Sequence, residues 1–257
     1  MEATMSEQIA KNRKFMHCPH FFEVMKESDQ SKGIAHPPHG HEVRGTLIEL
    51  PPFSDIAKNV SYADLLDSRR SQRVFTENPI TGAQLAFLLW SAQGIQDFRG
   101  ENQVATLRPA PSGGARHPFE LYFVAQNVDG LEPGLYRYAP LSHVGEKRVA
   151  IEYLGVFEDY ETRITELLSG QKWASKSPLV LFFSAVPYRA EWRYKDASHR
   201  VMLIDLGHVG QNVMLSAQAL GLGSCCIAAY NQALCDEALG FDGEQEYTVY
   251  AIPIGTL

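Results

Sequence analysis

Three arginines and a serine lie within five residues of one another, in the segment Arg69-Arg70-Ser71-Gln72-Arg73. A guanidinium presents a planar fork of N–H donors to phosphate oxygens, and its charge strengthens these hydrogen bonds. The segment therefore predicts a phosphate-binding site. A solvent-exposed run of charge is the alternative interpretation of such a pattern when it stands alone.

A second candidate is the loop sequence RPAPSGGARHP, which covers residues 108–118 and holds three prolines and two adjacent glycines. Such a composition favours neither helix nor strand. It predicts a rigid loop, formed by Pro111, Ser112, Gly113 and Gly114, whose backbone can approach a flat ligand closely. The segment has neither the GK[ST] ending of a Walker loop nor a GxGxxG pattern. An ordinary turn before a strand is the alternative.

The third candidate covers residues 203–230, where a long apolar stretch meets Gly221, Gly223 and Ser224 and then a run of small side chains. The apolar part predicts a buried helix that ends at the glycines. Small side chains from Cys226 to Ala229 would leave main-chain N–H groups open to a ligand. The alternative is a core helix with a glycine stop.

The elements that position these segments can be predicted from periodicity and capping signals. Helices are expected over residues 6–25 (as one or two), 61–66, from Thr81 onward, 160–168 and 199–220, and strands over residues 119–125, 134–139, 149–154, 178–186 and 247–254. The continuous apolar run at 178–186 is typical of a strand covered on both faces. Because strands and helices do not alternate regularly, we expect an α+β fold with a mostly antiparallel sheet and a long core helix.

Composition excludes several classes of protein. The chain has 257 residues, a net charge of −7 and a 45% apolar share, which argues against general nucleic-acid or anionic-membrane binding and against disorder. Its four cysteines form no CxxC motif and no disulfide scaffold. The most apolar stretch is interrupted by Asp205 and His208, and the first residues lack an apolar signal core. We therefore expect a soluble cytoplasmic protein with reduced thiols.

Histidines gather in the first 50 residues, which hold five of the nine. Their spacing matches no standard zinc pattern, so no metal site is expected. The adjacent Cys225 and Cys226 are expected to be small buried hydrophobic side chains.

In their order and spacing, the three segments resemble the FMN-dependent nitroreductase superfamily. The sequences RPAPSGGARHPFELY, GLYRYAP and HRVMLIDLGHVGQN are most similar to its SagB-type branch, which includes dehydrogenases that oxidise thiazolines and oxazolines. The resemblance spans roughly residues 61–255. It implies a nitroreductase-like α+β fold, with residues 56–257 as the FMN-binding domain and residues 1–55 as an N-terminal extension or arm.

The resemblance also implies roles for individual residues, in a homodimer with FMN at the subunit interface. The phosphate and ribityl chain would be held by Arg69, Arg70, Ser71 and Arg73. The isoalloxazine ring would lie between Pro111, Ser112, Gly113 and Gly114 of the second subunit and Cys226, Ile227, Ala228 and Ala229. Main-chain N–H groups near Ala228 and Ala229 would face the flavin N5 and O4. No protein nucleophile is expected.

The implied reaction is ping-pong hydride transfer from NAD(P)H through flavin N5 to a small electron-poor acceptor. One alternative is a SagB-type azoline dehydrogenase that acts on a modified peptide, with Tyr194 and Lys195 at the flavin. The other alternative is a non-catalytic flavin-binding subunit. Two departures from the family pattern motivate this alternative: Ala115 stands where many relatives have asparagine, and the C-terminus has no basic residue.

Overall fold

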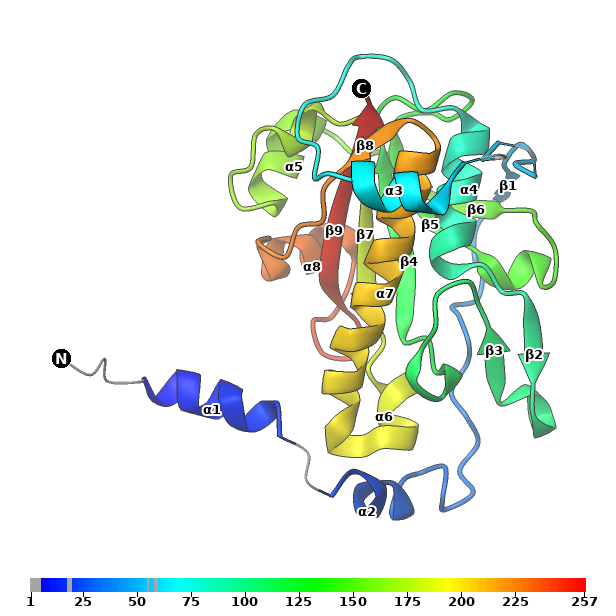
Figure 1. The fold of residues 1–257 in the computed structure, drawn as a ribbon, viewed down its shortest axis with the longest axis vertical. Coiled ribbons are helices and arrows are strands. Elements are labelled where there is room, and N and C mark those ends of the chain that lie inside the picture. Colours follow the sequence, from blue (N-terminus) through cyan, green and yellow to red (C-terminus); the bar gives the residue numbers. More distant parts are fainter. Residues whose placement is uncertain (1–5, 18–19, 55, 58–59) are drawn as a thin grey trace.

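A seven-stranded sheet forms the middle of the fold (Figure 1) in the computed structural model, which describes residues 6–17, 20–54, 56–57 and 60–257. The strand order is β1-β6-β5-β4-β7-β9-β8, and all these neighbours are antiparallel. The strands are β1 (Leu47–Glu49), β4 (Phe119–Ala125), β5 (Gly134–Tyr138), β6 (Ala150–Gly155), β7 (Leu179–Ala185), β8 (Leu222–Ser224) and β9 (Tyr247–Thr256). A separate hairpin pairs β2 (Asp97–Arg99) with β3 (Ala105–Leu107).

Helices cover both faces of this sheet. One face carries α4 (Gly82–Gln93) and the long α7 (Ser198–Ala219), and the other carries α5 (Tyr160–Leu167) and α8 (Gln232–Leu239). Helix α3 (Tyr62–Ser68) lies at the C-terminal end of α7, and α6 (Tyr188–Tyr194) lies at its N-terminal end (Figure 1). Near the N-terminus, α2 (Phe21–Lys26) contacts α6, whereas α1 (Glu7–Phe15) projects away from the body of the protein.

Local sequence explains where the helices next to the candidate site begin. The Ser61 hydroxyl accepts a hydrogen bond from the Asp64 N–H and so caps α3. Thr81 forms a capping box with Gln84 at the start of α4, because each side chain accepts from the backbone N–H of the other residue.

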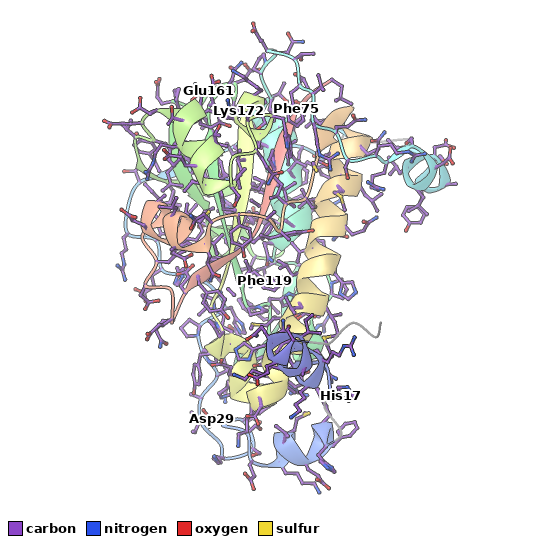
Figure 2. All side chains as sticks on the ribbon, turned by 90° about the vertical axis from the view of Figure 1, so that its left-hand side faces the viewer. His17, Asp29, Phe75, Phe119, Glu161 and Lys172 are labelled. Atoms are coloured by element: carbon purple, nitrogen blue, oxygen red, sulfur yellow. The ribbon has the colours of Figure 1, made fainter. Side chains whose placement is uncertain are left out.

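Side chains of alternating residues fill two cores, one on each side of the sheet. Phe119, Leu121 and Phe123 of β4 pack toward α4 and α7, whereas Tyr122 and Val124 pack toward α5 and α8. Figure 2 shows Phe119 inside the fold and Glu161 and Lys172 at its surface. Every residue of β7 is buried, which confirms that this apolar strand is covered on both faces.

The observed elements confirm the expected α+β fold and the predicted helices and strands to within a few residues. The prediction did not include the helices α6 and α8 or the short strands β1, β2, β3 and β8. Strand β1 lies within the expected N-terminal extension, yet it pairs with β6 at the edge of the main sheet. Among the described residues, no helix combines the length and apolar character needed to cross a membrane.

Candidate functional site

The arginine-rich segment lies where α3 ends, beside strand β8. Ser71 forms a parallel bridge with Ser224, and the Gln72 N–H donates to the Ser224 carbonyl over 2.9 Å. At Gly223 an added Cβ would come within 2.8 Å of the Gln72 Cβ, so only glycine allows the two backbones to approach this closely. The fold therefore fixes the arginine segment against the chain that leads to Cys226.

Within the residues that the structure describes, the guanidiniums of Arg69, Arg70 and Arg73 have no carboxylate partner. The arginine–carboxylate pairs found among the described residues all involve other arginines. Arg70 donates only to main-chain carbonyls, and Arg73 lies over the Trp173 ring at 5.6 Å from its centroid. Three positive charges without counter-charges fit a phosphate group, as the sequence predicts.

The segment after β8 presents both paired and unpaired backbone groups. Ile227 exchanges two hydrogen bonds with Ala251, over 2.8 and 3.2 Å, and its side chain is buried in the core. Ala228 and Ala229 are exposed, and their N–H groups have no acceptor within the described part of the chain. The hydrogen bonds and buried side chain of Ile227 thus hold the segment in place, and the N–H groups of Ala228 and Ala229 can donate to a ligand.

Cys226 lies half-buried between this segment and α7. Burial raises the pKa of its thiol to about 11, and the nearby positive charge of Arg69 opposes that rise only in part. The thiol therefore stays protonated and is a poor nucleophile near neutral pH. Its closeness to Arg69 shows that the fold brings the first and third predicted segments together.

The Pro-Ser-Gly-Gly loop packs against the N-terminal half of α7. Its anchor is Asp205, whose carboxylate accepts from the Ser112 hydroxyl over 2.6 Å and from the Gly113 N–H over 3.0 Å. The Ser112 oxygen in turn accepts from the His117 N–H over 2.9 Å. Because these bonds occupy the Ser112 side chain, the loop would present its backbone and Pro111 to a ligand.

Both glycines of the loop are required by close contacts. An added Cβ would lie 2.4 Å from Val201 at Gly113 and 2.6 Å from the Tyr194 hydroxyl at Gly114, whose φ is +58°. The next residues continue this unusual backbone, with φ of +52° at Ala115 and +43° at His117. Non-glycine residues in this region are strained, and such strain concentrates at functional sites.

Asp205 is the residue of this site that the sequence analysis missed. It was noted only as a polar interruption of an apolar helix. That interruption was the available signal, because an acid on the buried face of a helix needs partners nearby. Burial raises the pKa of this carboxyl, and the bonds from Ser112 and Gly113 oppose the rise.

One chain does not bring the loop and the arginine segment together. Asp205 holds the loop, whereas Gln218, thirteen residues further along α7, donates to Ser68 at the end of α3. At 1.5 Å per helical residue, the two points are roughly 20 Å apart. Each chain therefore carries two half-sites, with the loop beside the N-terminal half of α7 and the arginine segment beside its C-terminal end.

Beside the loop, α7 exposes an apolar face. Leu203 and Ile204 are 57% and 56% exposed, and at the neighbouring Gly207 an added Cβ would meet no atom within 4 Å. A long helix that keeps large apolar side chains in water is typical of an interface.

The Tyr194 and Lys195 pair lies beside the loop. Tyr194 is buried, with its hydroxyl next to Gly114, and Lys195 lies 3.7 Å from the Glu27 carboxylate of the extension. Within the described ranges, no cluster of three or more metal-ligating side chains occurs.

Buried His117 makes the loop sensitive to acid. Burial and the Arg108 charge lower the pKa of His117 to about 2, so the folded protein keeps this ring neutral. The unfolded chain takes up a proton near pH 6.5, and stability therefore falls as the pH drops below that value. For this residue we expect a loss of about 2 kcal/mol in the free energy of unfolding between pH 7 and 5.

Urea unfolding of the wild type and of His117→Gln at pH 7 and pH 5 checks this expectation. The variant should lose less stability on acidification than the wild type, and His199→Gln, at a half-exposed position on α7, should behave like the wild type. Equal pH dependence of the wild type and H117Q contradicts the assignment.

A family model for the "Nitroreductase family" matches residues 66–256, which include all three segments. The chain belongs to the nitroreductase family. This membership confirms the resemblance drawn from the sequence and makes the protein an oxidoreductase enzyme. The fold is accordingly the nitroreductase fold.

Individual relatives extend this comparison. The chain is 32% identical over 208 residues to "Putative nitroreductase MJ1384" of Methanocaldococcus jannaschii. The aligned region covers 81% of this chain and 95% of that protein. It is 30% identical to the trifolitoxin-processing protein TfxB of Rhizobium leguminosarum bv. trifolii, over 52% of this chain and 36% of the relative. A crystal structure of a nitroreductase homologue from Anabaena variabilis superposes with a TM-score of 0.68 at 22% identity, over 95% of this chain and 45% of that one.

Proposed function

We propose that this enzyme binds FMN and transfers a hydride from NAD(P)H to a small electron-poor acceptor. The observation that carries the proposal is the pairing of two features at one place. Three arginines that have no carboxylate partner among the described residues adjoin Ala228 and Ala229, whose N–H groups have no acceptor there either. The first feature suits a phosphate and the second suits the polar edge of a flavin ring.

We further propose that the working unit is a homodimer. A two-fold axis perpendicular to α7, at the exposed face near Gly207, would run two copies of the helix antiparallel. The Ser112–Gly114 loop of one chain would then approach the Arg69–Arg73 segment of the other. This arrangement joins the two half-sites that a single chain keeps apart.

The described residues would act mainly by holding and orienting the cofactor. Arg69, Arg70, Ser71 and Arg73 would bind its phosphate and ribityl end, and Cys226, Ala228 and Ala229 would line one side of the ring, with Ile227 anchoring them. Pro111, Ser112, Gly113 and Gly114 would cover the other side. FMN supplies the hydride-accepting chemistry when bound, and the protein supplies positioning and N–H donors.

Titration of the purified protein with FMN, followed by absorbance, tests this proposal. Arg69→Gln should weaken FMN binding at least tenfold, because a hydrogen bond to a charged group contributes about 1.5–3 kcal/mol. Arg99→Gln, on the exposed β2 strand, is the matched control and should bind like the wild type. Wild-type protein that binds no FMN contradicts the proposal.

The second candidate function is oxidation of an azoline ring in a modified peptide. Tyr194 beside Gly114 and the adjacent Lys195 favour it, since removal of a proton must accompany loss of the hydride. Likeness to a toxin-processing protein supports it as well. Anaerobic addition of NADH and NADPH to the FMN-loaded protein distinguishes the two candidate functions. Rapid bleaching of the flavin absorbance bands supports the reductase. Flavin that neither donor reduces supports the dehydrogenase or an inert subunit.

A further inference from the structure

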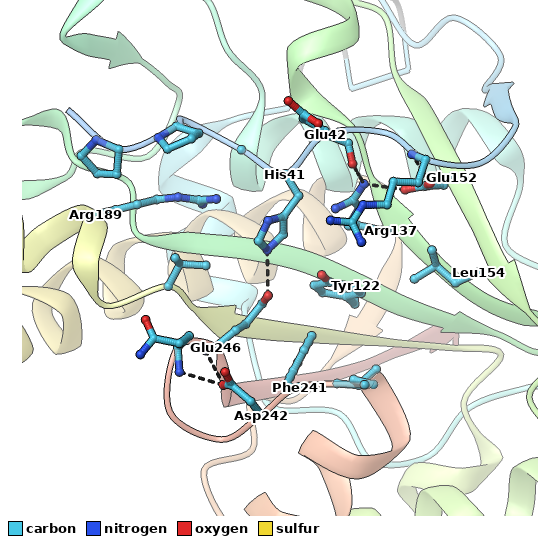
Figure 3. Close-up of a pocket in the computed structure, with 18 of the residues that line it drawn as sticks. His41, Glu42, Tyr122, Arg137, Glu152, Leu154, Arg189, Phe241, Asp242 and Glu246 are labelled. Carbon is cyan, nitrogen blue, oxygen red and sulfur yellow. Dashed lines mark hydrogen bonds and ion pairs between the residues drawn. The ribbon is translucent and has the colours of Figure 1, made fainter. Parts of the chain in front are cut away.

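A cavity of about 800 Å³ lies on the sheet face opposite α7, away from the proposed flavin site (Figure 3). Its walls come from the extended arm at residues 37–44, from β4, β5 and β6, from the start of α6 and from the turn between α8 and β9. The arm crosses the sheet here and leaves the space beneath it unfilled.

Two buried arginines line the inner wall of this cavity. Arg137 donates through Nη2 to Glu152 over 2.5 Å, and Arg189 donates through Nη2 to Glu120 over 2.5 Å. Their side chains are only 9% and 4% exposed. Yet Arg137 Nε and Arg189 Nη1 have no hydrogen-bond partner within the part of the chain that the structure describes. Unpaired buried donors of this kind are costly, so an acceptor is missing from the wall.

The acids of the cavity, by contrast, have their partners. Glu246 accepts from the Ser184 hydroxyl over 2.5 Å and lies 2.7 Å from the His41 ring (Figure 3). Asp242 accepts from three backbone N–H groups of its own turn, and these bonds lower the pKa of its carboxyl. The cavity therefore lacks acceptors rather than donors.

A third guanidinium, that of Arg108, lies behind the inner wall. Arg108 lies close enough to Glu120 and Arg189 for their charges to act on it, and although burial lowers its pKa to about 10, it stays protonated. Arg108 does not itself line the cavity, whose charged lining consists of Arg44, Arg137, Arg189, Glu42, Glu152, Asp242 and Glu246. The positive charge open to a ligand carboxylate is therefore local, at the unpaired N–H groups of Arg137 and Arg189.

Another part of the cavity lining is apolar. Tyr122 and Phe241 meet edge to face with ring centroids 5.0 Å apart, and Leu154 and Leu239 extend the same surface. Glu42 and Asp242 stand exposed at the rim. An acidic rim disfavours a dianionic phosphate, whereas a single carboxylate can reach the arginines behind an apolar body.

We propose that this cavity binds a small carboxylic acid with an aromatic or branched aliphatic body. The carboxylate accepts hydrogen bonds from Arg137 and Arg189, and the body packs against Tyr122, Phe241 and Leu154. A modest shift of the guanidiniums presents their unpaired N–H groups to the ligand. The site is distinct from the flavin site, because the sheet separates it from α7.

Isothermal titration calorimetry with 3-phenylpropionate on the full-length protein tests this proposal. We expect saturable binding at least tenfold tighter than that of 3-phenylpropionamide, which has the same body without the charge; tenfold corresponds to about 1.4 kcal/mol. Equal affinities for the two probes, or no saturable binding of the acid, would overturn the proposal.

Two matched variants locate the binding without breaking an ion pair. Leu154→Glu puts a negative charge into the cavity wall and should weaken 3-phenylpropionate binding at least tenfold. Val156→Glu places the same charge two residues further on, at a position 73% exposed and outside the cavity, and should change the affinity less than twofold. Unchanged binding by L154E, or equal losses in both variants, would show that the acid binds elsewhere.

A double variant tests the role of the arginine. Glu120→Gln with Arg189→Met removes both members of the buried pair, so neither member is left without the other. Provided that its circular dichroism matches the wild type, we expect its preference for the acid over the amide to fall at least threefold. If that spectrum shows unfolding, Arg137→Lys serves instead, since it keeps the charge and removes the unpaired Nε. An undiminished preference in a folded variant would overturn the arginine contact.

Discussion

Asp205→Ala will loosen the Pro-Ser-Gly-Gly loop and lower the free energy of unfolding by about 3 kcal/mol. The Asp205 carboxylate holds both the Ser112 hydroxyl and the Gly113 N–H. Alanine removes both acceptors and leaves the half-buried Gly113 N–H unpaired. Bonds to a charged acceptor contribute about 1.5–3 kcal/mol each, and part of this is recovered when water enters the site.

Two measurements check this expectation. Urea unfolding gives the loss of stability, and amide hydrogen exchange should show faster exchange in residues 112–117 than in the β4 strand. Asp196→Ala is the matched control, because Asp196 is an exposed acid just before α7. Wild-type stability together with wild-type exchange of the loop in D205A would contradict an anchoring role.

The same variant bears on the proposed function. If the loop covers the flavin ring, D205A should weaken FMN binding even in preparations that remain folded, whereas Asp196→Ala should not. Asp205→Asn should be milder than D205A, because its amide oxygen still accepts one of the two bonds. If FMN affinity falls from wild type to D205N and further to D205A in folded protein, the loss comes from the position of the loop and not from general destabilisation.

If the protein is the homodimer proposed above, Gly207→Arg will convert it to a monomer and reduce its affinity for FMN at least tenfold. A new arginine on the apolar face of α7 would bring two like charges together at the two-fold axis, where they would be desolvated. The monomer itself should remain folded, because a Cβ at Gly207 meets no atom within 4 Å. Arginine also has a higher helix propensity than glycine, by up to about 1 kcal/mol.

Sedimentation velocity and FMN titration on the same samples check this result. Val156→Arg places the same charge at an exposed position on the far side of the sheet, and it should stay dimeric and bind FMN normally. A monomeric G207R that binds FMN as well as the wild type would show that one chain contains the complete site. A dimeric G207R would place the interface elsewhere.

The sequence by itself determined the elements whose signals are local. Ser61 and Thr81 mark helix starts through bonds within one turn, and the apolar runs of β7 and α7 mark buried elements through their length and period. The order of the arginine segment, the Pro-Ser-Gly-Gly loop and the small-residue stretch also sufficed to identify the family.

Only the tertiary structure decided which of these segments meet. Bonds between residues far apart in sequence, such as Gln72 to Ser224 and Gly113 to Asp205, leave no periodic signal in either partner. Strand β1 could not be predicted for the same reason. It is too short to show a periodic pattern, and it forms because it pairs with the edge strand β6. The cavity beneath the arm could not be predicted either, because its arginines and carboxylates come from segments scattered from residue 42 to residue 246.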